Sequence, residues 1–186
     1  MAEIEQLFDQ LRGLKMPPVA HWHPRKTLDI DLRIAEDGRW YYRGSAIERR
    51  RMVKLFGALL RLERDGGHCL ITPHLKYPVT VDDAPFQAVE LSRRDVGGQQ
   101  HLVFRTNVDD VVAAGRDHPI RVITDPTSGA PSPYIEVRDG LQAKICRSVY
   151  YELAQLLEPA GQADDADGAM LGVYSAGVFF PFGRMP

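Results

Sequence analysis

The stretch LDIDLRIAEDGRWYYRGSAIERRRMVKLFGALL (Leu28–Leu60) decides the fold that we expect for this chain. It begins with an alternation of apolar and charged residues, which is the pattern of a strand with one buried face. The apolar positions are Leu28, Ile30, Leu32 and Ile34. Asp37-Gly38 is a turn dipeptide, and the aromatic segment Arg39–Arg43 can return beside the first strand. The sequence therefore predicts a β-hairpin.

A helix is expected directly after the hairpin. Ser45–Glu48 reads SAIE, the pattern of a capping box, in which the Ser45 hydroxyl bonds the backbone of Glu48 and the Glu48 side chain reaches back. Apolar residues then recur at helical spacing. They are Met52, Leu55, Phe56, Leu59 and Leu60. We expect this helix to end by Asp65–Gly67 and to be followed by extended segments at 68–73, 77–81 and 86–91.

The second half of the chain has the same order of elements. Residues 133–137 and 141–145 read as strands around the turn dipeptide Asp139-Gly140, residues 146–158 read as a helix, and 169–180 supplies further strands. Sliding one half over the other places Arg147 on Arg50 and aligns the apolar positions of the two helices. These pairs are Val149 on Met52, Leu153 on Phe56, Leu156 on Leu59 and Leu157 on Leu60. We interpret this order as a duplicated hairpin–helix–strand unit, although two common segments matching by accident give the same pattern.

The expected fold class is α+β, with two small antiparallel-sheet domains that each carry one main helix. An additional N-terminal helix is predicted from the apolar spacing between Ile4 and Leu14. Gly97-Gly98 is the expected boundary, which gives domains 1–96 and 97–186. The small, acidic segment 160–168 reads as a solvated loop.

The composition of the 186-residue chain is that of a globular protein. A formal charge of −2 at pH 7 lacks the strongly basic face that a nucleic-acid polymer requires. Two cysteines without CxxC spacing are too few for a disulfide scaffold. No apolar run reaches the roughly 20 residues of a spanning helix, and the N-terminus lacks the pattern of a signal peptide. We therefore expect a cytoplasmic protein that neither binds nucleic-acid polymers nor enters membranes.

Several motifs, spread over nearly the whole chain, together resemble one bacterial family. They are HWHP around Trp22, the stretch from Asp29 to Arg61, LITP, VTVDDAPFQAVEL, FRTNVDDVV, HPIRV and PSPYIEVRDGLQAKICRSVYYEL. The family is known as domain of unknown function 1285. The resemblance implies two domains with a duplicated core, the C-terminal one loosely similar to pleckstrin-homology folds. It also implies a site for a nucleotide-like ligand at the groove between the domains, and a signalling role, but no reaction.

The triplet HWH raises the question of a metal site. Residues i and i+2 of a strand share a face, so His21 and His23 could both reach one metal ion. A catalytic zinc site needs three protein ligands, and no third ligand lies at partner spacing. Trp22, between them, reads either as a core anchor or as a stacking platform for a ligand.

Other motifs of enzymes and cofactor sites are incomplete. DDADG at Asp164–Gly168 lacks the first and the closing ligand of a calcium loop. VYSAG around Ser175 approaches a nucleophile elbow but has Val173 in place of the first glycine. There is no phosphate-binding glycine loop and no dinucleotide fingerprint. The sequence therefore predicts no catalytic residue, no metal and no cofactor.

The predicted ligand site combines arginines with polar and aromatic residues. Arginines in the first turn of a helix oppose the helix dipole, unless a bound anion compensates or carboxylates pair with them in solvent. Thr and Asn at the end of a strand can read a base or ribose edge, and they also simply build turns. The predicted site residues are Trp22, Arg49, Arg50, Thr106, Asn107 and Tyr134.

The function expected from these features is that of a small-molecule-binding protein with a signalling role. Its ligand would be small and anionic or nucleotide-like, held at the groove between the domains. One alternative is a metal-dependent hydrolase that uses His21 and His23. Another is a protein–protein adaptor, for which an exposed apolar patch containing Phe179, Phe180 and Phe182 would be the structural sign.

Overall fold

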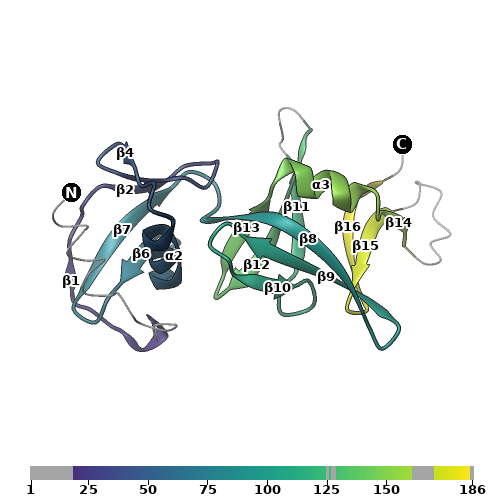
Figure 1. Ribbon diagram of the computed structural model, residues 1–186, viewed down its shortest axis with the longest axis horizontal. Helices are drawn as coiled ribbons and strands as arrows, with labels where there is room; N and C mark the ends of the chain where they lie inside the picture. Colours follow the sequence, from purple (N-terminus) through teal and green to yellow (C-terminus); the bar gives the residue numbers. More distant parts are fainter. Residues whose placement is uncertain (1–18, 125, 127–128, 161–169, 185–186) are drawn as a thin grey trace. The chain divides into compact units, whose positions relative to one another are not determined.

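The computed structural model describes residues 19–124, 126, 129–160 and 170–184 (Figure 1). The chain forms two compact units, Met1–Pro85 and Phe86–Pro186. The division falls at Pro85 rather than at Gly97-Gly98, because these two glycines, both at positive φ, form a hairpin turn inside the second unit. The predicted N-terminal helix lies outside the described residues, and so does 161–168 of the predicted acidic loop.

The N-terminal unit is one sheet with a helix. Its strands lie in the order β4-β3-β2-β7-β6-β5, and β1 also pairs with β7. In chain order its elements are η1 (Val19–His21), β1 (Lys26–Thr27), β2 (Leu32–Ile34), β3 (Trp40–Tyr42), β4 (Ser45–Ala46), α2 (Arg50–Leu59), β5 (Leu60–Leu62), β6 (His68–Ile71) and β7 (Leu75–Val81). The predicted hairpin is confirmed as β2 paired antiparallel with β3. The predicted extended segments at 68–73 and 77–81 are confirmed as β6 and β7.

The strand predicted over Leu28–Ile34 is shorter than expected. β1 and β2 both run parallel to β7, and the chain between them leaves the ladder. The backbone N–H of Asp31 donates to the Asp29 carboxylate at 2.9 Å, and Asp31 has φ 58°. A short acidic side chain that bonds the backbone two residues on competes with strand pairing. The alternation still marks the core correctly from Ile30 onward, but Leu28 is 43% exposed.

The predicted capping box is wrong, although the helix itself is confirmed. Ser45 lies in β4, opposite Tyr42, and α2 begins only after Arg49, which caps it without a side-chain bond. The helix also ends earlier than predicted, because Leu60 turns to extended backbone and starts β5. The buried face of α2 carries Phe56, whose ring lies 5.9 Å from that of the buried Trp40.

The C-terminal unit contains a six-stranded sheet in the order β10-β9-β8-β13-β12-β11 and a three-stranded sheet in the order β14-β15-β16. Its elements are β8 (Phe86–Val96), β9 (Gln99–Thr106), β10 (Val111–Ala113), β11 (Ile120–Thr124), β12 (Pro131–Arg138), β13 (Leu141–Ile145), α3 (Arg147–Ala154), β14 (Glu158–Pro159), β15 (Met170–Ser175) and β16 (Val178–Arg184). The predicted hairpin around Asp139-Gly140 is confirmed as β12 and β13. The predicted helix is confirmed but ends at Ala154.

The fold class is α+β, with sheets that are mostly antiparallel and one α-helix in the described part of each unit. Parallel pairs occur where β7 meets β1 and β2, and where β13 meets β8. Each helix buries one apolar side, through Met52 and Phe56 in α2 and through Val149 and Leu153 in α3. None of the helices in the described ranges has the length and apolar character that crossing a membrane requires.

Candidate functional site

A hollow of about 320 Å³ lies in the C-terminal unit at the start of α3. Three segments form it: the start of β12, the end of β13 and the first turns of the helix. Its lining residues are Pro131, Ser132, Pro133, Lys144, Ile145, Arg147, Tyr150 and Tyr151. The hollow therefore combines two basic side chains with two tyrosines and two prolines, and no acidic residue lines it.

The Arg147 guanidinium is the best-defined polar group of the hollow. Its Nε donates to the Tyr151 hydroxyl at 2.9 Å, and its Cζ lies 5.6 Å from the centre of the Tyr151 ring. Among the described residues the two Nη nitrogens have no hydrogen-bonding partner. The phenol thus fixes the guanidinium through one nitrogen and leaves its terminal edge for a ligand.

The fold places these side chains by fixing both ends of the β13–α3 connection. Ile145 is buried, and the backbone N–H of Cys146 donates to the carbonyl of Ala88 at 3.1 Å. Val149 and Leu153 then anchor α3 in the core. Residues four apart on a helix share a face, which is why positions 147 and 151 meet.

The second tyrosine is held from another element. The Tyr150 ring stacks on Phe182 of β16, with ring centres 6.3 Å apart and planes 28° apart. Tyr151, in contrast, is 52% exposed and offers a ring face at the surface. The Tyr150 ring is therefore packed within the unit, whereas the Tyr151 ring is accessible at the surface.

The predicted site residues of the N-terminal unit lie around η1 and α2. Trp22 is half-buried, and its backbone carbonyl accepts a hydrogen bond from Arg61 at 2.8 Å. The bond to Trp22 ties the segment after η1 to β5, and Arg61 is itself held by a bond to the Glu63 carboxylate at 2.7 Å. Arg49 and Arg50 are exposed at the start of α2, where each has an interaction partner.

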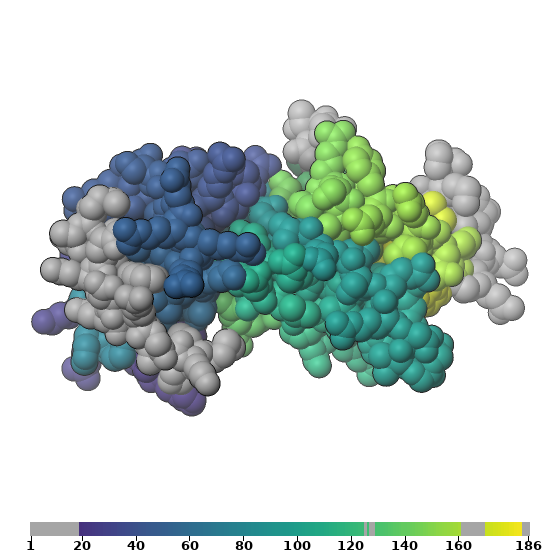
Figure 2. All heavy atoms as spheres, viewed as in Figure 1, coloured from purple at the N-terminus to yellow at the C-terminus, as the bar shows by residue number. Residues whose placement is uncertain are grey.

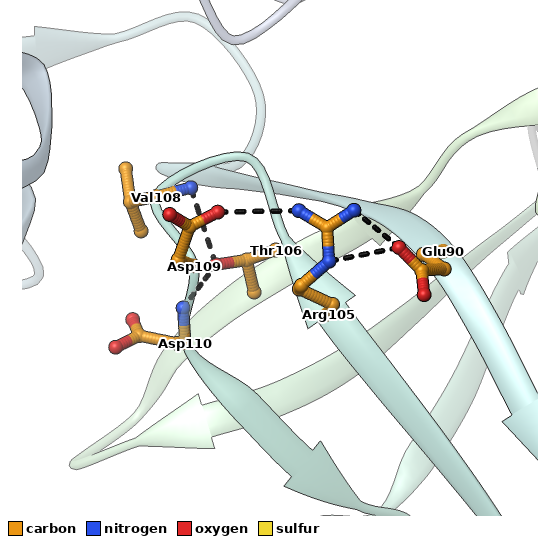
Figure 3. A network of polar contacts seen from close by, with 6 residues as sticks. All are labelled: Glu90, Arg105, Thr106, Val108, Asp109 and Asp110. Atoms are coloured by element: carbon orange, nitrogen blue, oxygen red, sulfur yellow. Dashed lines mark hydrogen bonds and ion pairs between the residues drawn. The ribbon is translucent and has the colours of Figure 1, made fainter. Parts of the chain in front are cut away.

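Thr106, drawn in Figure 3, and Asn107 build the turn between β9 and β10. The Thr106 side chain is fully buried, and its hydroxyl accepts the backbone N–H groups of Val108 and Asp110 at 3.3 and 3.0 Å. The Asn107 side-chain oxygen accepts the backbone N–H of Gln87 at 3.0 Å. The turn-building role that the sequence offered as an alternative is the one that the structure shows for both.

Arg105 reinforces the same corner. Its guanidinium bonds Glu90 of β8 and, at 3.2 Å, Asp109, as Figure 3 shows. The hydrogen bond that Arg105 donates to the Glu90 carboxylate, together with the negative charge of that carboxylate, raises the pKa of Arg105 above its ordinary value. These exposed pairs hold the strands in register more than they add stability.

Tyr134 is buried in β12. Its cross-strand neighbour on β13 is Lys144, which lines the hollow. Tyr134 is thus the predicted residue that lies beside the hollow. Whether the six predicted residues share one ligand stays a prediction.

The sequence missed the residues of the hollow as a site, although it aligned Arg147 with Arg50. A signal was present in the spacing of Arg147 and Tyr151 on a predicted helix, since an arginine and a tyrosine four residues apart can form a fixed pair. Lys144 and the two prolines come from other segments. Only the tertiary structure brings them to this place.

The two histidines of the alternative metal site do not lie on a strand. His21 ends a short 3₁₀ helix and His23 lies outside any strand, so the face-sharing argument for a strand does not apply. In the described ranges no three His, Cys, Asp or Glu side chains form a group that could hold a metal ion.

The three phenylalanines named for the adaptor alternative are buried or half-buried. Phe180 is buried, Phe179 packs against Tyr174 with ring centres 4.9 Å apart, and Phe182 stacks on Tyr150. These phenylalanines belong to the packing of β15, β16 and α3.

A second hollow, of about 400 Å³, lies in the N-terminal unit beside β6 and β7. Asp29, Asp31, Glu63 and Asp65 line it together with Lys76 and His68. Glu63 is paired with Arg61 and, at 3.7 Å, with Lys76. Burial lowers the pKa of His68, which favours its neutral form in the folded protein.

Comparisons with known proteins place the chain in a family. Residues 17–84 match the domain of unknown function DUF1285, N-terminal domain, and residues 85–182 match its C-terminal domain. No curated protein matches the chain.

Two solved structures are similar to the protein. A DUF1285 family protein from Silicibacter pomeroyi DSS-3 is 39% identical over 98% of this chain and 95% of that chain, with a TM-score of 0.86. A DUF1285 family protein from Shewanella baltica OS155 is 26% identical over 67% of this chain and 90% of that chain, with a TM-score of 0.53. The two domain matches, which meet at residues 84 and 85, and the 39% identical structure show that the chain belongs to the DUF1285 family.

Proposed function

We propose that the protein binds a small anionic ligand of the nucleotide kind in the hollow at the start of α3. The observation that carries the proposal is the Arg147 guanidinium, which Tyr151 fixes through Nε while its terminal nitrogens have no partner among the described residues. A guanidinium held in this way can form two parallel bonds to a phosphate or carboxylate.

Charge supports an anion at this place. Lys144 adds a second positive charge to the lining, and none of the lining residues is acidic. A charge-assisted hydrogen bond contributes about 1.5–3 kcal/mol, roughly twice as much as a neutral one. Because Arg147 is already oriented, less side-chain entropy is lost on binding.

The rings and the size of the hollow indicate the rest of the ligand. Tyr151 and the prolines present flat, apolar surfaces on which a planar ring can stack. Ligand pockets commonly have volumes of about 300–1,000 Å³. At about 320 Å³ the hollow suits a mononucleotide better than a dinucleotide.

A role in signalling in the cytoplasm belongs to the same proposal. It is supported by the incomplete enzyme motifs of the sequence and by the basic and aromatic lining of the hollow, which suits binding of an anion. A ligand would shift the protein toward the conformation that binds it more tightly. The size of this shift is set by the difference in the ligand's affinity for the two conformations.

We also propose that the two units descend from one duplicated element, and that the C-terminal unit is related to pleckstrin-homology folds. Support for the duplication comes from the helices. Arg50 and Arg147 are the first residues of α2 and α3, and the aligned pairs Met52–Val149 and Phe56–Leu153 are buried in both. Each helix follows a hairpin, and a three-stranded antiparallel meander follows each helix.

Calorimetric titration with AMP, GMP and inorganic phosphate tests the binding proposal. We expect the nucleotides to bind more tightly than phosphate, because only they can use the rings. Arg147→Gln should weaken nucleotide binding by about tenfold or more, which corresponds to about 1.4 kcal/mol. Tyr151→Phe should cause a smaller loss, since it removes the hydroxyl that orients the guanidinium but keeps the ring.

Arg116→Gln is the matched control, because Arg116 is exposed in the same unit and does not line the hollow. Circular dichroism checks that each variant is folded. The proposal is overturned if neither nucleotide binds at millimolar concentration, or if Arg147→Gln binds as tightly as the unmodified protein.

A further inference from the structure

β8 has two differently occupied edges. Along one edge it pairs with β9 from Ala88 to Val96. Along the other it pairs with β13 only from Phe86 to Ala88. The β8–β9 register shifts at Val89, and beyond this bulge the two strands continue together as a ribbon (Figure 1). Among the described residues, no strand pairs with the outer edge of β8 from Glu90 to Val96.

The backbone groups at this edge can be assigned from the neighbouring strand. On β9, the N–H of Leu102 donates to Ser175 and its carbonyl accepts from Ala114, so both groups point away from β8. Arg93 is the cross-strand partner of Leu102. In an antiparallel pair, two such residues both turn their backbone groups outward. Arg93, and by the period of two Leu91 and Asp95, therefore present N–H and C=O groups to the outer edge.

The side chains along this edge give it a positive charge. All of them from Ser92 to Val96 are exposed. Arg93 and Arg94 form no ion pair with any described residue. Of the two nearby carboxylates, that of Glu90 is paired with Arg105, whereas that of Asp95 accepts the backbone N–H of Gly98 at 3.0 Å and keeps its charge, so the two arginines outnumber one acidic side chain. Figure 2 shows the teal β8–β9 hairpin at the surface of the molecule.

We propose that the outer edge of β8, from Leu91 to Asp95, binds an extended acidic peptide of a partner protein as an additional strand. The outward backbone groups would supply the hydrogen bonds of the added strand, and the arginines would select its sequence. Arg93 and Arg94 point to opposite faces of the ribbon, because successive side chains of a strand alternate. Two adjacent acidic residues in the peptide would therefore each meet one arginine.

Charge also distinguishes this occupant from a second copy of the chain. Two β8 edges paired antiparallel about Arg93 would set arginines against arginines, and like charges directly opposite each other are destabilising. Arginines on an open edge also serve to prevent association in some proteins. If the arginines only prevent association, the edge would bind no peptide at all. The experiment below separates this possibility from peptide binding.

Fluorescence anisotropy with labelled synthetic peptides tests the proposal on the full chain. The probe is an extended, Val- and Thr-rich peptide of about seven residues with a central Glu-Glu pair, and its control has Lys-Lys at the same place. We expect the Glu-Glu peptide to bind about tenfold or more tightly than the Lys-Lys peptide, and the difference to shrink at high salt. N-methylation of alternate peptide amides should abolish binding, because it removes the donors that a strand needs.

The variant Arg93→Glu/Arg94→Glu should reverse the preference between the two peptides. Arg121→Glu, an exposed arginine on β11, is the matched control and should keep it. Arg147→Gln should also keep it, so peptide binding and nucleotide binding are tested separately.

Three results would overturn the proposal. One is equal or absent binding of the Glu-Glu and Lys-Lys peptides, and another is binding that N-methylation does not change. The third is a dimer in light scattering that Arg93→Glu/Arg94→Glu disrupts, because the occupant would then be a second copy. The N-methylated peptides decide the matter on the unmodified protein if the double variant does not fold.

Discussion

Ser175→Ala should destabilise the C-terminal unit far more than the loss of one small polar atom suggests. Ser175 is fully buried at the end of β15. Its hydroxyl donates to the carbonyl of Ala114 at 2.7 Å and accepts the backbone N–H of Leu102 at 2.9 Å. The substitution leaves a buried donor and a buried acceptor without their partner.

The expected magnitude follows from these two bonds. An unsatisfied buried backbone group costs about 1–3 kcal/mol, so the pair should lower the free energy of unfolding by about 2–6 kcal/mol. For a unit of about 100 residues, each kcal/mol corresponds to about 4–8 °C, which predicts a fall in Tm of at least about 8 °C.

Urea unfolding followed by far-UV circular dichroism measures this change, provided that the m-value stays constant. Ser92→Ala is the control, because Ser92 is exposed and its hydroxyl reaches the Val103 carbonyl only at 3.5 Å. That variant should change stability by less than about 0.5 kcal/mol. A loss below about 1 kcal/mol for Ser175→Ala would refute the reasoning.

Three further predictions concern single residues. Hydrogen bonds from Arg33 hold the pKa of Asp82 below its ordinary value of 3.8, so the stability that this pair contributes is present above that pH and is lost as the pH falls. Between about pH 5 and pH 3, the urea midpoint of Asp82→Asn should therefore fall less than that of the unmodified protein. Burial lowers the pKa of His68 below its ordinary value of 6.5, so on acidification the unfolded chain takes up a proton before the folded protein does, and the folded protein loses stability. In urea unfolding, His68→Gln should remove this loss of stability below about pH 6.5. A Cβ on Gly172 would lie 2.3 Å from the Phe180 carbonyl oxygen, so Gly172→Ala should cost about 1–3 kcal/mol in urea unfolding.

Each of these has a result that would contradict it. Asp82→Asn could lose stability on acidification as steeply as the unmodified protein, and His68→Gln could keep the full slope below pH 6.5. For Gly172→Ala, an unchanged midpoint would mean that the Phe180 backbone can move aside without cost.

The hairpins were the part of the fold that the sequence predicted best. Asp37-Gly38 and Asp139-Gly140 are local turn signals, and in both cases the flanking segments pair as expected. Helix boundaries were predicted less well. SAIE resembles a cap, but Ser45 pairs across from Tyr42 instead, because strand pairing outweighs a local capping pattern.

The candidate site could be predicted only in part. The sequence pointed to arginines in the first turn of a helix and aligned Arg147 with Arg50, because these features depend on local spacing. The hollow itself was not evident from the sequence, since Pro131, Lys144 and Arg147 meet only after β12, β13 and α3 have packed together. Thr106 illustrates a related difficulty: a hydroxyl that could contact a ligand is also suited to closing a turn, and here it accepts two backbone N–H groups of the turn.

The manner in which β15 meets β9 has a consequence for local opening. The contact consists of the Ser175 bridge, the Gln100 side chain bonded to the Tyr174 carbonyl at 2.8 Å, and the backbone bond from Ala176 to Gln100. It is not a continuous ladder, so these bonds between β15 and β9 can open while every strand keeps its own sheet partners. The Leu102 amide, which donates across this seam, would then exchange its hydrogen with solvent sooner than the amides inside either sheet.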